Sequence, residues 1–313
     1  MIPIILALPA FIVAVLLLWK GSDVLVEGTS KTAIHLGISS LIISVIIVGF
    51  GTSAPEFAIS VGAAIQNNSD ISLGNIIGSC IANLFLVLGV ASIIRPINIK
   101  KNIIRREFLI MLGATLILFI SSNIGLLDEY RWFGGFIFLI FFVIFVGFFI
   151  MCAKNERIKQ KDIAVNKTQK HIIFIIIGII GVVAGAWLLI ESAVVIADFL
   201  GIPTFVIALS LVAVGTSVPE LVVSSMASYK KESDIAVGNV LGSNVFNILL
   251  ILGVAALFIP LKATLYVDHL LILLGVTIFM FPILDIGKLI SRRKGVILLV
   301  IYFIYIWYIF FYP

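Results

Sequence analysis

The sequence predicts an all-α membrane protein with ten transmembrane helices in two inverted five-helix repeats. Three features support this fold class: the composition, the length of the apolar stretches and an internal repeat. Of 313 residues, 62% are hydrophobic and 12% are charged, whereas soluble domains carry about 25% charged residues. The mean hydropathy of +1.26 is too high for a water-soluble surface. This composition excludes a soluble enzyme, a disordered chain and a nucleic-acid-binding protein, although the formal net charge is +5.

Apolar stretches long enough to cross a bilayer recur along the whole chain. A spanning helix needs about 20 apolar residues, so a chain of this length with short loops allows about ten spans. The first stretch lacks a basic start and an Ala-x-Ala cleavage site, which indicates a first span rather than a signal peptide. The expected spans are 3–19, 40–65, 72–94, 107–122, 132–152, 172–197, 204–228, 236–259, 268–283 and 295–312.

One polar segment divides these spans into two halves. It runs from Lys154 to Lys170 and contains the sequence KNERIKQKD. At this length it is too short for a domain and is expected to be a solvated linker. We therefore expect a first repeat at 1–153, a linker at 154–170 and a second repeat at 171–313.

The two halves match each other when the chain is shifted by 164 residues. Over residues 51–96, 21 of 46 positions are identical to their mates without a gap. GTSAPE at 51–56 matches GTSVPE at 215–220, and the matches include Gly, Pro, Glu, Asn and Ser as well as apolar residues. Apolar bias alone would not align these residue types, so the chain contains an internal duplication.

Each half holds an odd number of spans, so the second half enters the membrane from the opposite side. Inverted repeats of this kind are a transporter architecture with the binding site near the midplane. Cytoplasmic loops retain Lys and Arg, and 19 of the 21 basic residues fall on one set of alternate loops, leaving Arg131 and Lys262 on the other. We therefore expect a cell-membrane protein with both termini outside and the linker in the cytoplasm.

Glu56 and Glu220 lie inside long apolar stretches, at the same place in both halves. An ionisable side chain at that depth costs about 2.5–3.5 kcal/mol on insertion scales, and its default interpretation is functional. The alternative is a protonated glutamic acid that serves packing. No Lys or Arg lies within these spans, so facing carboxylates would need cations or protons between them.

The proline before each motif glutamate leaves a nearby backbone carbonyl without its helical hydrogen bond. Pro55 has no N–H, so the carbonyl of Gly51 loses its helical partner and neighbouring carbonyls such as that of Thr52 can tilt away. In a bilayer, freed carbonyls persist only when another group satisfies them, and a dehydrated cation would do so. Gly215 and Pro219 repeat this arrangement.

Helical spacing of four residues then places further oxygen ligands together. The pairs are Thr52 with Glu56, Ser79 with Asn83, Thr216 with Glu220, and Ser243 with Asn247. Such a ligand set suits hard ions such as calcium and sodium, and the lack of nearby His and Cys argues against zinc, copper or nickel. Cys80 and Cys152 are interpreted as packing residues. Four other matched acidic residues are expected to form caps or interfacial ion pairs: Glu27, Glu191, Asp70 and Asp234.

The motifs themselves resemble a known family. GFGTSAPE at 49–56 with GSCIAN at 78–83 is similar to the first alpha-repeat of the calcium/cation antiporter superfamily, and AVGTSVPE at 213–220 with GNVLGSNVFN at 238–247 is similar to the second. The resemblance covers nearly the whole chain and is strongest to prokaryotic, archaeal-type sodium/calcium exchangers. It implies alternating access by ten helices.

The resemblance also implies a ligand set. Calcium would be held by Glu56, Glu220 and the carbonyls of Thr52 and Thr216. Sodium would use overlapping and flanking positions, which here are Ser53, Ser217, Ser79, Ser243, Asn83, Asn247 and the backbone oxygens of Gly49 and Ala213. The position of Asn247 is Asp in the potassium-dependent branch of the superfamily and in some archaeal exchangers. The proton-coupled branch usually has a Gly-Asn-x-x-Glu pattern that these motifs lack.

The expected function is therefore sodium/calcium antiport, electrogenic and independent of potassium. A calcium/proton antiporter on the same fold is the alternative, and a cation channel is a third possibility that the repeat disfavours. No enzyme activity and no cofactor are expected, and calcium and sodium are the transported ligands. The lipid bilayer is the expected environment. Nucleic acid, nucleotide and an obligate protein partner are not expected.

Overall fold

The computed structural model describes residues 3–99, 104–159, 168–200, 215–285 and 289–311. Within these ranges the regular elements are helices, apart from two short strands. Seven helices are long and apolar enough to cross a membrane, and a bent pair, Ser40–Thr52 followed by Ala54–Ile65, is an eighth candidate. The protein is an all-helical membrane protein, as its hydropathy predicts.

The elements before the central linker begin with one long helix and continue as shorter segments. They are α1 (Ile4–Leu36), α2 (Ser40–Ile43), η1 (Ser44–Val48), α3 (Gly49–Thr52), α4 (Ala54–Ile65), α5 (Ser69–Ala82), η2 (Asn83–Val87), α6 (Leu88–Ile94), β1 (Ile97–Asn98), η3 (Ile104–Phe108), α8 (Leu109–Asn123) and α9 (Arg131–Lys159). Here η1, η2 and η3 are π-helical turns.

The elements after the linker follow a similar order. They are α10 (Thr168–Phe199), α13 (Val218–Tyr229), α14 (Ser233–Val245), η5 (Phe246–Ile251), α15 (Leu252–Phe258), η6 (Ala263–Tyr266), α16 (Val267–Asp285), β2 (Leu289–Ile290) and α17 (Arg292–Phe311). η5 is a π-helical segment and η6 is a 3₁₀ turn.

Most expected spans agree with these helices to within a few residues. The expected span at 204–228 is described only from Gly215 onward, and the span at 295–312 corresponds to α17. Asp70 and Asp234 lie in the first turns of α5 and α14, where the helix dipole favours a negative charge. Asn68 caps α5 by accepting a hydrogen bond from the backbone N–H of Ile71 at 3.1 Å.

The expected end of the first span at residue 19 is wrong. Helix α1 is 33 residues long in total. It ends at Leu36 and is capped by Gly37, which has a positive φ of 66°. A helix of this length is about 50 Å long, more than the hydrocarbon thickness of about 30 Å. The polar residues that suggested a loop lie on α1, where other side chains pair with them. One such pair is Glu27 with Lys31, one helical turn apart.

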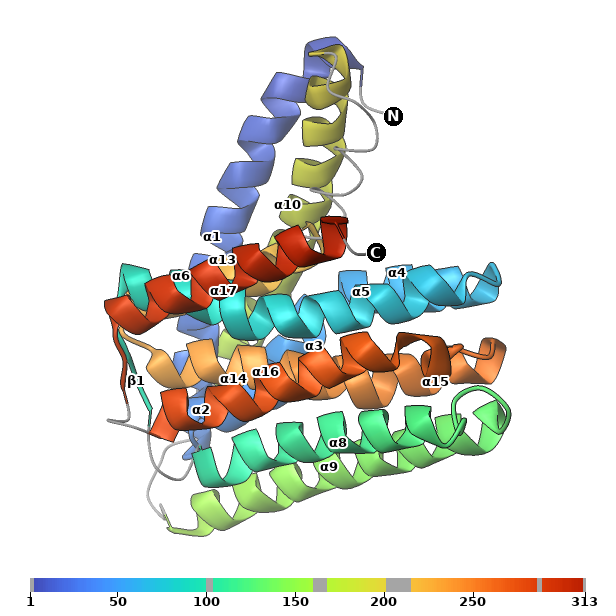
Figure 1. Cartoon of the computed structure of the whole chain (residues 1–313). Helices are drawn as coiled ribbons and strands as arrows, with labels where there is room; N and C mark the ends of the chain where they lie inside the picture. Colours follow the sequence, from blue (N-terminus) through green and yellow to red (C-terminus); the bar gives the residue numbers. More distant parts are fainter. Residues whose placement is uncertain (1–2, 100–103, 160–167, 201–214, 286–288, 312–313) are drawn as a thin grey trace.

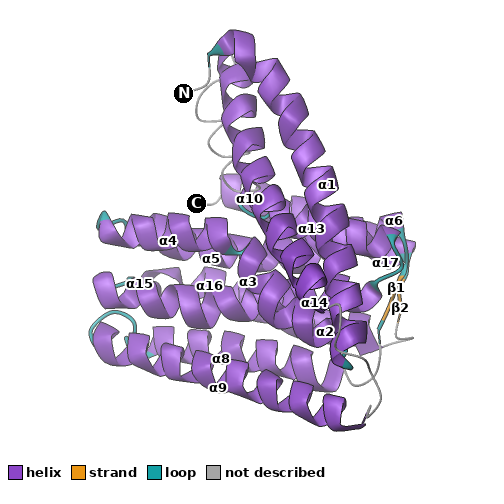
Figure 2. Cartoon of the chain, turned by 180° about the vertical axis from the view of Figure 1, so that it is seen from behind, coloured by secondary structure: helices purple, strands orange, loops and turns teal. Residues whose placement is uncertain are grey.

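Helix α1 packs along α10, and the two make the most extensive contact between elements in the described part of the chain. They lie side by side and run at a steep angle to most of the other helices, which are roughly parallel to one another (Figure 1). Figure 2 shows the same arrangement from behind. Glycines allow this close approach, as small residues do between membrane helices. A Cβ atom added at Gly28 would lie 2.9 Å from the backbone nitrogen of Ile175, and one added at Gly178 would lie 2.7 Å from that of Leu25.

We expect Gly178→Ala to destabilise the protein, because the new methyl group would press on the backbone of α1. Overpacking of this kind costs about 1–3 kcal/mol. Gly147→Ala in α9 is the matched control, since a Cβ atom there meets no atom within 4 Å. Thermal unfolding in detergent should give a lower midpoint for Gly178→Ala than for Gly147→Ala. Equal midpoints would contradict this account of the α1–α10 contact.

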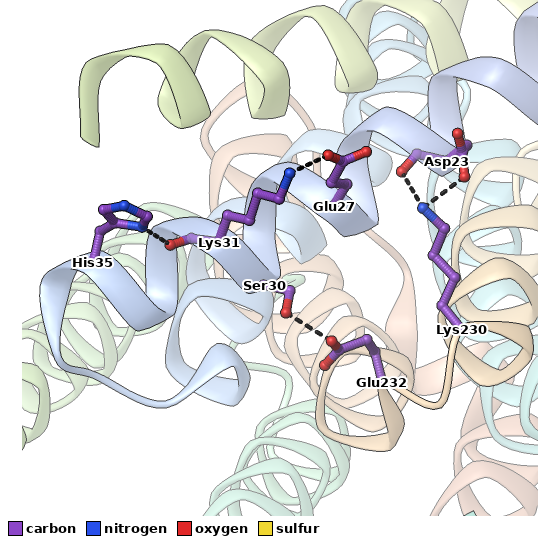
Figure 3. A network of polar contacts seen from close by, with 7 residues as sticks. All are labelled: Asp23, Glu27, Ser30, Lys31, His35, Lys230 and Glu232. Carbon is purple, nitrogen blue, oxygen red and sulfur yellow. Dashed lines mark hydrogen bonds and ion pairs between the residues drawn. The ribbon is translucent and has the colours of Figure 1, made fainter. Parts of the chain in front are cut away.

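Polar contacts join α1 to the turn between α13 and α14 (Figure 3). The Lys230 ammonium lies 2.6 Å from the Asp23 carboxylate and donates to its backbone carbonyl at 3.0 Å. The Ser30 hydroxyl donates to the Glu232 carboxylate at 2.6 Å. These contacts hold the middle of α1 against the second half of the chain.

The two segments at 69–94 and 233–258 are the most enclosed of the seven candidate spans in the described part of the chain. In each, 83% of the residues in the most apolar window are buried, against 44% or less in the other five candidate spans. They therefore form the centre of the bundle. Strands β1 and β2 pair antiparallel, with Ile97 opposite Ile290, and connect the end of α6 to the start of α17.

Candidate functional site

In both GTSxPE motifs the serine lies directly before a helix, and in the first half it separates two helical segments. Ser53 separates α3 from α4 with φ −78° and ψ 9°, and the segments on either side are bent by 48°. Ser217 precedes α13 with nearly the same angles, φ −83° and ψ 4°. Pro55 and Pro219 occupy the first turn of the following helix, where a missing N–H is tolerated. In the first half, the break therefore lies close to the turn that Pro55 was expected to disturb.

Each motif glutamate lies near the start of the helix that follows the motif serine. Glu56 lies in the first turn of α4 and Glu220 in the first turn of α13. Both side chains are fully buried. In broken-helix transporters, unwound backbone carbonyls and the C-terminal ends of half-helices coordinate cations.

One oxygen of each carboxylate is hydrogen-bonded and the other is not. Glu56 Oε1 accepts from the Ser79 hydroxyl at 3.4 Å. Glu220 Oε1 accepts from the hydroxyls of Ser53 and Ser243, each at 3.2 Å. The Oε2 atoms of both glutamates are buried without a hydrogen-bond partner in the described part of the chain. Such atoms are costly unless another group satisfies them.

The motif threonines contact the opposite half of the protein. Thr52 Oγ1 donates to Asn239 Oδ1 at 3.0 Å and lies 3.4 Å from Ser243 Oγ. Thr216 Oγ1 donates to Asn75 Oδ1 at 3.4 Å and lies 3.3 Å from Ser79 Oγ. The spacing of four residues predicts a pairing of Thr52 with Glu56 instead. The helix break at Ser53 separates the two and directs the Thr52 hydroxyl across the halves.

Asn75 and Asn239 also lie in this region, although the ligand pattern of the sequence does not include them. The Asn75 amide nitrogen donates to Ser60 Oγ at 2.9 Å, and the Asn239 nitrogen donates to Ser224 Oγ at 3.0 Å. Each asparagine therefore ties the motif helix of its own half to the threonine of the other half. Their presence at matched positions of the repeat was the available signal.

Gly49 lies where its half packs against α14. A Cβ atom there would meet the backbone nitrogen of Ser243 at 2.9 Å, so only glycine permits this approach. The Gly49 carbonyl accepts from the Ser243 hydroxyl at 3.3 Å and from the backbone N–H of Ser53 at 3.1 Å. Its mate, Ala213, lies outside the described residues.

A second layer of amides lies one turn along the central helices. Asn83 begins the π-helical turn η2, and Asn247 lies within η5. Single π-helical turns inside α-helices are frequent at functional sites. Both side chains are fully buried. Asn83 Oδ1, both amide atoms of Asn247 and the Ser217 hydroxyl have no hydrogen-bond partner among the described residues.

Eleven of the residues predicted as ligands fall within the described part of the chain. All of them are buried, and they lie where the two halves meet. This group comprises Gly49, Thr52, Ser53, Glu56, Ser79, Asn83, Thr216, Ser217, Glu220, Ser243 and Asn247. Over the described ranges, no three His, Cys, Asp or Glu side chains gather at one point. A cation held here would therefore use the two carboxylates together with hydroxyl, amide and backbone oxygens, the ligand types of hard cations.

Known proteins resemble this chain over nearly its whole length. The sodium/calcium exchanger protein family matches residues 6–151 and 170–311. A sodium/calcium exchanger of Methanosarcina acetivorans, MaX1, is 31% identical over 90% of this chain and 92% of its own length. An uncharacterised membrane protein of Methanocaldococcus jannaschii is 35% identical over 96% of this chain and 97% of its own.

The fold agrees with a solved exchanger. A structure of the sodium-calcium exchanger NCX_Mj superposes with a TM-score of 0.85 at 33% identity, covering 96% of this chain and 98% of that one. Because the superposition covers 96% of this chain, it includes both halves. The family match extends over both halves as well. The chain belongs to the sodium/calcium exchanger protein family.

Proposed function

We propose that this protein exchanges sodium for calcium across the cell membrane by alternating access, that the exchange is electrogenic and that it needs no potassium. The observation that carries the proposal is the pair of buried Glu56 and Glu220 carboxylates, each with one oxygen unpaired among the described residues. With both ionised, the site would carry two negative charges. One calcium ion balances that charge, and several sodium ions that replace it would move net charge.

The proposed ligands follow the repeat. Glu56, Glu220 and the carbonyls of Thr52 and Thr216 would bind calcium. Sodium would bind at overlapping and flanking positions formed by Ser53, Ser217, Ser79, Ser243, Asn83, Asn247 and the backbone oxygens of Gly49 and Ala213. Support comes from the burial of the described side chains and from hydrogen bonds that recur in both halves.

The proposed architecture is ten helices in two inverted repeats, 1–153 and 171–313, joined by a linker at 154–170. Contacts between repeat mates support it, because residues on a pseudo-twofold axis touch their own mates. Cys80 and Asn244 are 164 residues apart. The Asn244 amide donates to the Cys80 carbonyl at 3.2 Å, and the Cys80 sulfur lies 4.0 Å from the Asn244 carbonyl oxygen.

A transport assay tests the function. Purified protein in liposomes should take up calcium-45 when a sodium gradient is imposed outward, and an outward proton gradient without sodium should not drive uptake. Uptake driven equally well by the proton gradient would favour the alternative, a calcium/proton antiporter. Calcium flux that needs neither gradient would indicate a channel. No uptake under any condition would refute the proposal.

The proposed orientation puts both termini outside and the linker in the cytoplasm. In a Cys152→Ser background, a cysteine within 154–170 should react with a membrane-impermeant maleimide only from the cytoplasmic side. A cysteine near Pro313 should react only from outside, because five spans separate the two positions. Labelling of both from the same side would contradict the inverted repeat. The natural Cys80 is fully buried and should give little background.

A further inference from the structure

Hydrogen bonds link three buried groups where the two halves meet: the Cys80 carbonyl, the Asn244 amide and the Asn83 amide. The Asn244 amide nitrogen donates to the Cys80 carbonyl oxygen at 3.2 Å and to Met111 Sδ at 3.6 Å. The Asn83 amide nitrogen donates to Asn244 Oδ1 at 3.0 Å. The side chains of Asn83 and Asn244 are at most 1% exposed.

These contacts determine which way both amides point. A backbone carbonyl can only accept, so Asn244 must present its NH₂ group to Cys80. Its oxygen then faces Asn83, which must in turn present its own NH₂ group. The Asn83 oxygen is therefore directed away from Asn244, and it is buried without a hydrogen-bond partner among the described residues. Asn83 lies one helical turn from Ser79, which contacts Glu56, so this oxygen belongs to the same face.

The repeat mate of Asn83 has no such support. Asn247 is the mate of Asn83, and Cys80 is the mate of Asn244. Neither polar atom of the Asn247 amide has a hydrogen-bond partner in the described ranges. At the position equivalent to Asn244 stands Cys80, whose thiol donates to the Asn244 backbone carbonyl across 4.0 Å. A thiol is a weak donor and a weak acceptor, so it is a much weaker partner for an amide than the side chain that orients Asn83.

We propose that Asn244 is a positioning residue that holds the Asn83 amide with its oxygen preset as a cation ligand, while Asn247 is left to turn. The inference rests on the proposed function, and it assigns unequal roles to two amides that the repeat makes equivalent. A ligand held in its binding orientation before the ion arrives lowers the cost of binding. Asn83 then contributes more to cation affinity than Asn247 does.

The first test is a double-mutant cycle with Asn244→Leu. Sodium affinity is measured as competition against calcium-45 bound to the purified protein in detergent. Loss of the orienting hydrogen bonds should weaken sodium binding roughly three- to tenfold. The same loss is expected in an Asn247→Ala background, and no further loss is expected in an Asn83→Ala background, where the positioned amide is absent.

An equal loss in all three backgrounds would mean that Asn244 acts through general packing, and the inference would be wrong. A second variant keeps the test decisive if Asn244→Leu does not fold. Exchanging the two mates, Cys80→Asn with Asn244→Cys, should transfer the support to Asn247. In the exchanged protein, Asn247→Ala should then weaken sodium binding more than Asn83→Ala does. The opposite order would overturn the proposal.

The wild-type protein separates this inference from the proposed function. One outcome is that the wild-type protein binds and exchanges both ions, while the effects of Asn244→Leu and Asn83→Ala simply add. This outcome contradicts only the role of Asn244. Wild-type protein that binds neither ion contradicts the proposed function and, with it, the assignment of Asn83 as a ligand.

Discussion

Replacing Glu56 or Glu220 by glutamine is expected to abolish calcium exchange while the protein still inserts and folds. Each substitution keeps the shape of a fully buried side chain and removes one of the two charges that would balance calcium. A pair of unit charges at about 4 Å interacts by roughly 4 kcal/mol at an effective dielectric of about 20. Calcium carries two charges and would lose about twice this energy, so its affinity should fall by at least roughly a thousandfold. Sodium, with one charge, should lose less.

Calcium-45 uptake into liposomes under a sodium gradient measures this effect, and binding to purified protein separates affinity from transport. Glu129→Gln is the matched control, because Glu129 is exposed in the connection between α8 and α9. It should leave uptake unchanged. Thermal unfolding of each variant checks that the protein remains folded. Wild-type exchange rates in either purified Glu56→Gln or Glu220→Gln would refute the assignment of the site.

Exchange is expected to continue at full rate when potassium is removed from both sides. A potassium ion is large and monovalent, and binding it beside calcium favours a further negative charge. The potassium-dependent relatives that the sequence resembles have Asp at the position of Asn247. Here Asn83 and Asn247 are both buried neutral amides, so the proposed site contains two carboxylates in total. The missing charge would be worth roughly 4 kcal/mol at about 4 Å by the same estimate.

The measurement is calcium-45 uptake under a sodium gradient with potassium replaced by choline, at a clamped membrane potential. A parallel experiment that replaces sodium by choline is the control, and uptake should then disappear. Changing the clamped potential should change the rate, because net charge moves when several sodium ions replace one calcium ion. Loss of uptake on removing potassium would contradict this interpretation of Asn247.

The sequence alone predicted the class of protein, and it singled out polar residues that the structure buries. Apolar stretches identify spans because the bilayer core cannot hydrogen-bond to exposed backbone. A carboxylate inside such a stretch is too costly to occur without a function. The repeat then singled out one glutamate in each half, Glu56 and Glu220, and Pro55 indicated a disturbed helix close to the break at Ser53. These conclusions depend only on local composition and on the comparison of one half with the other.

Only the tertiary structure decided the length of α1 and the partners of the buried amides. Helix α1 continues past its polar residues because the turn between α13 and α14 supplies Lys230 as a partner for Asp23 and Glu232 as a partner for Ser30. Thr52 bonds to Asn239, 187 residues away, and Asn83 bonds to Asn244, 161 residues away. A repeat identifies equivalent positions but does not say which residues touch across the two halves. Those contacts, and the orientation that the Cys80 carbonyl imposes on two amides, arise only when the halves pack together, because a hydrogen bond depends on distance and direction in space.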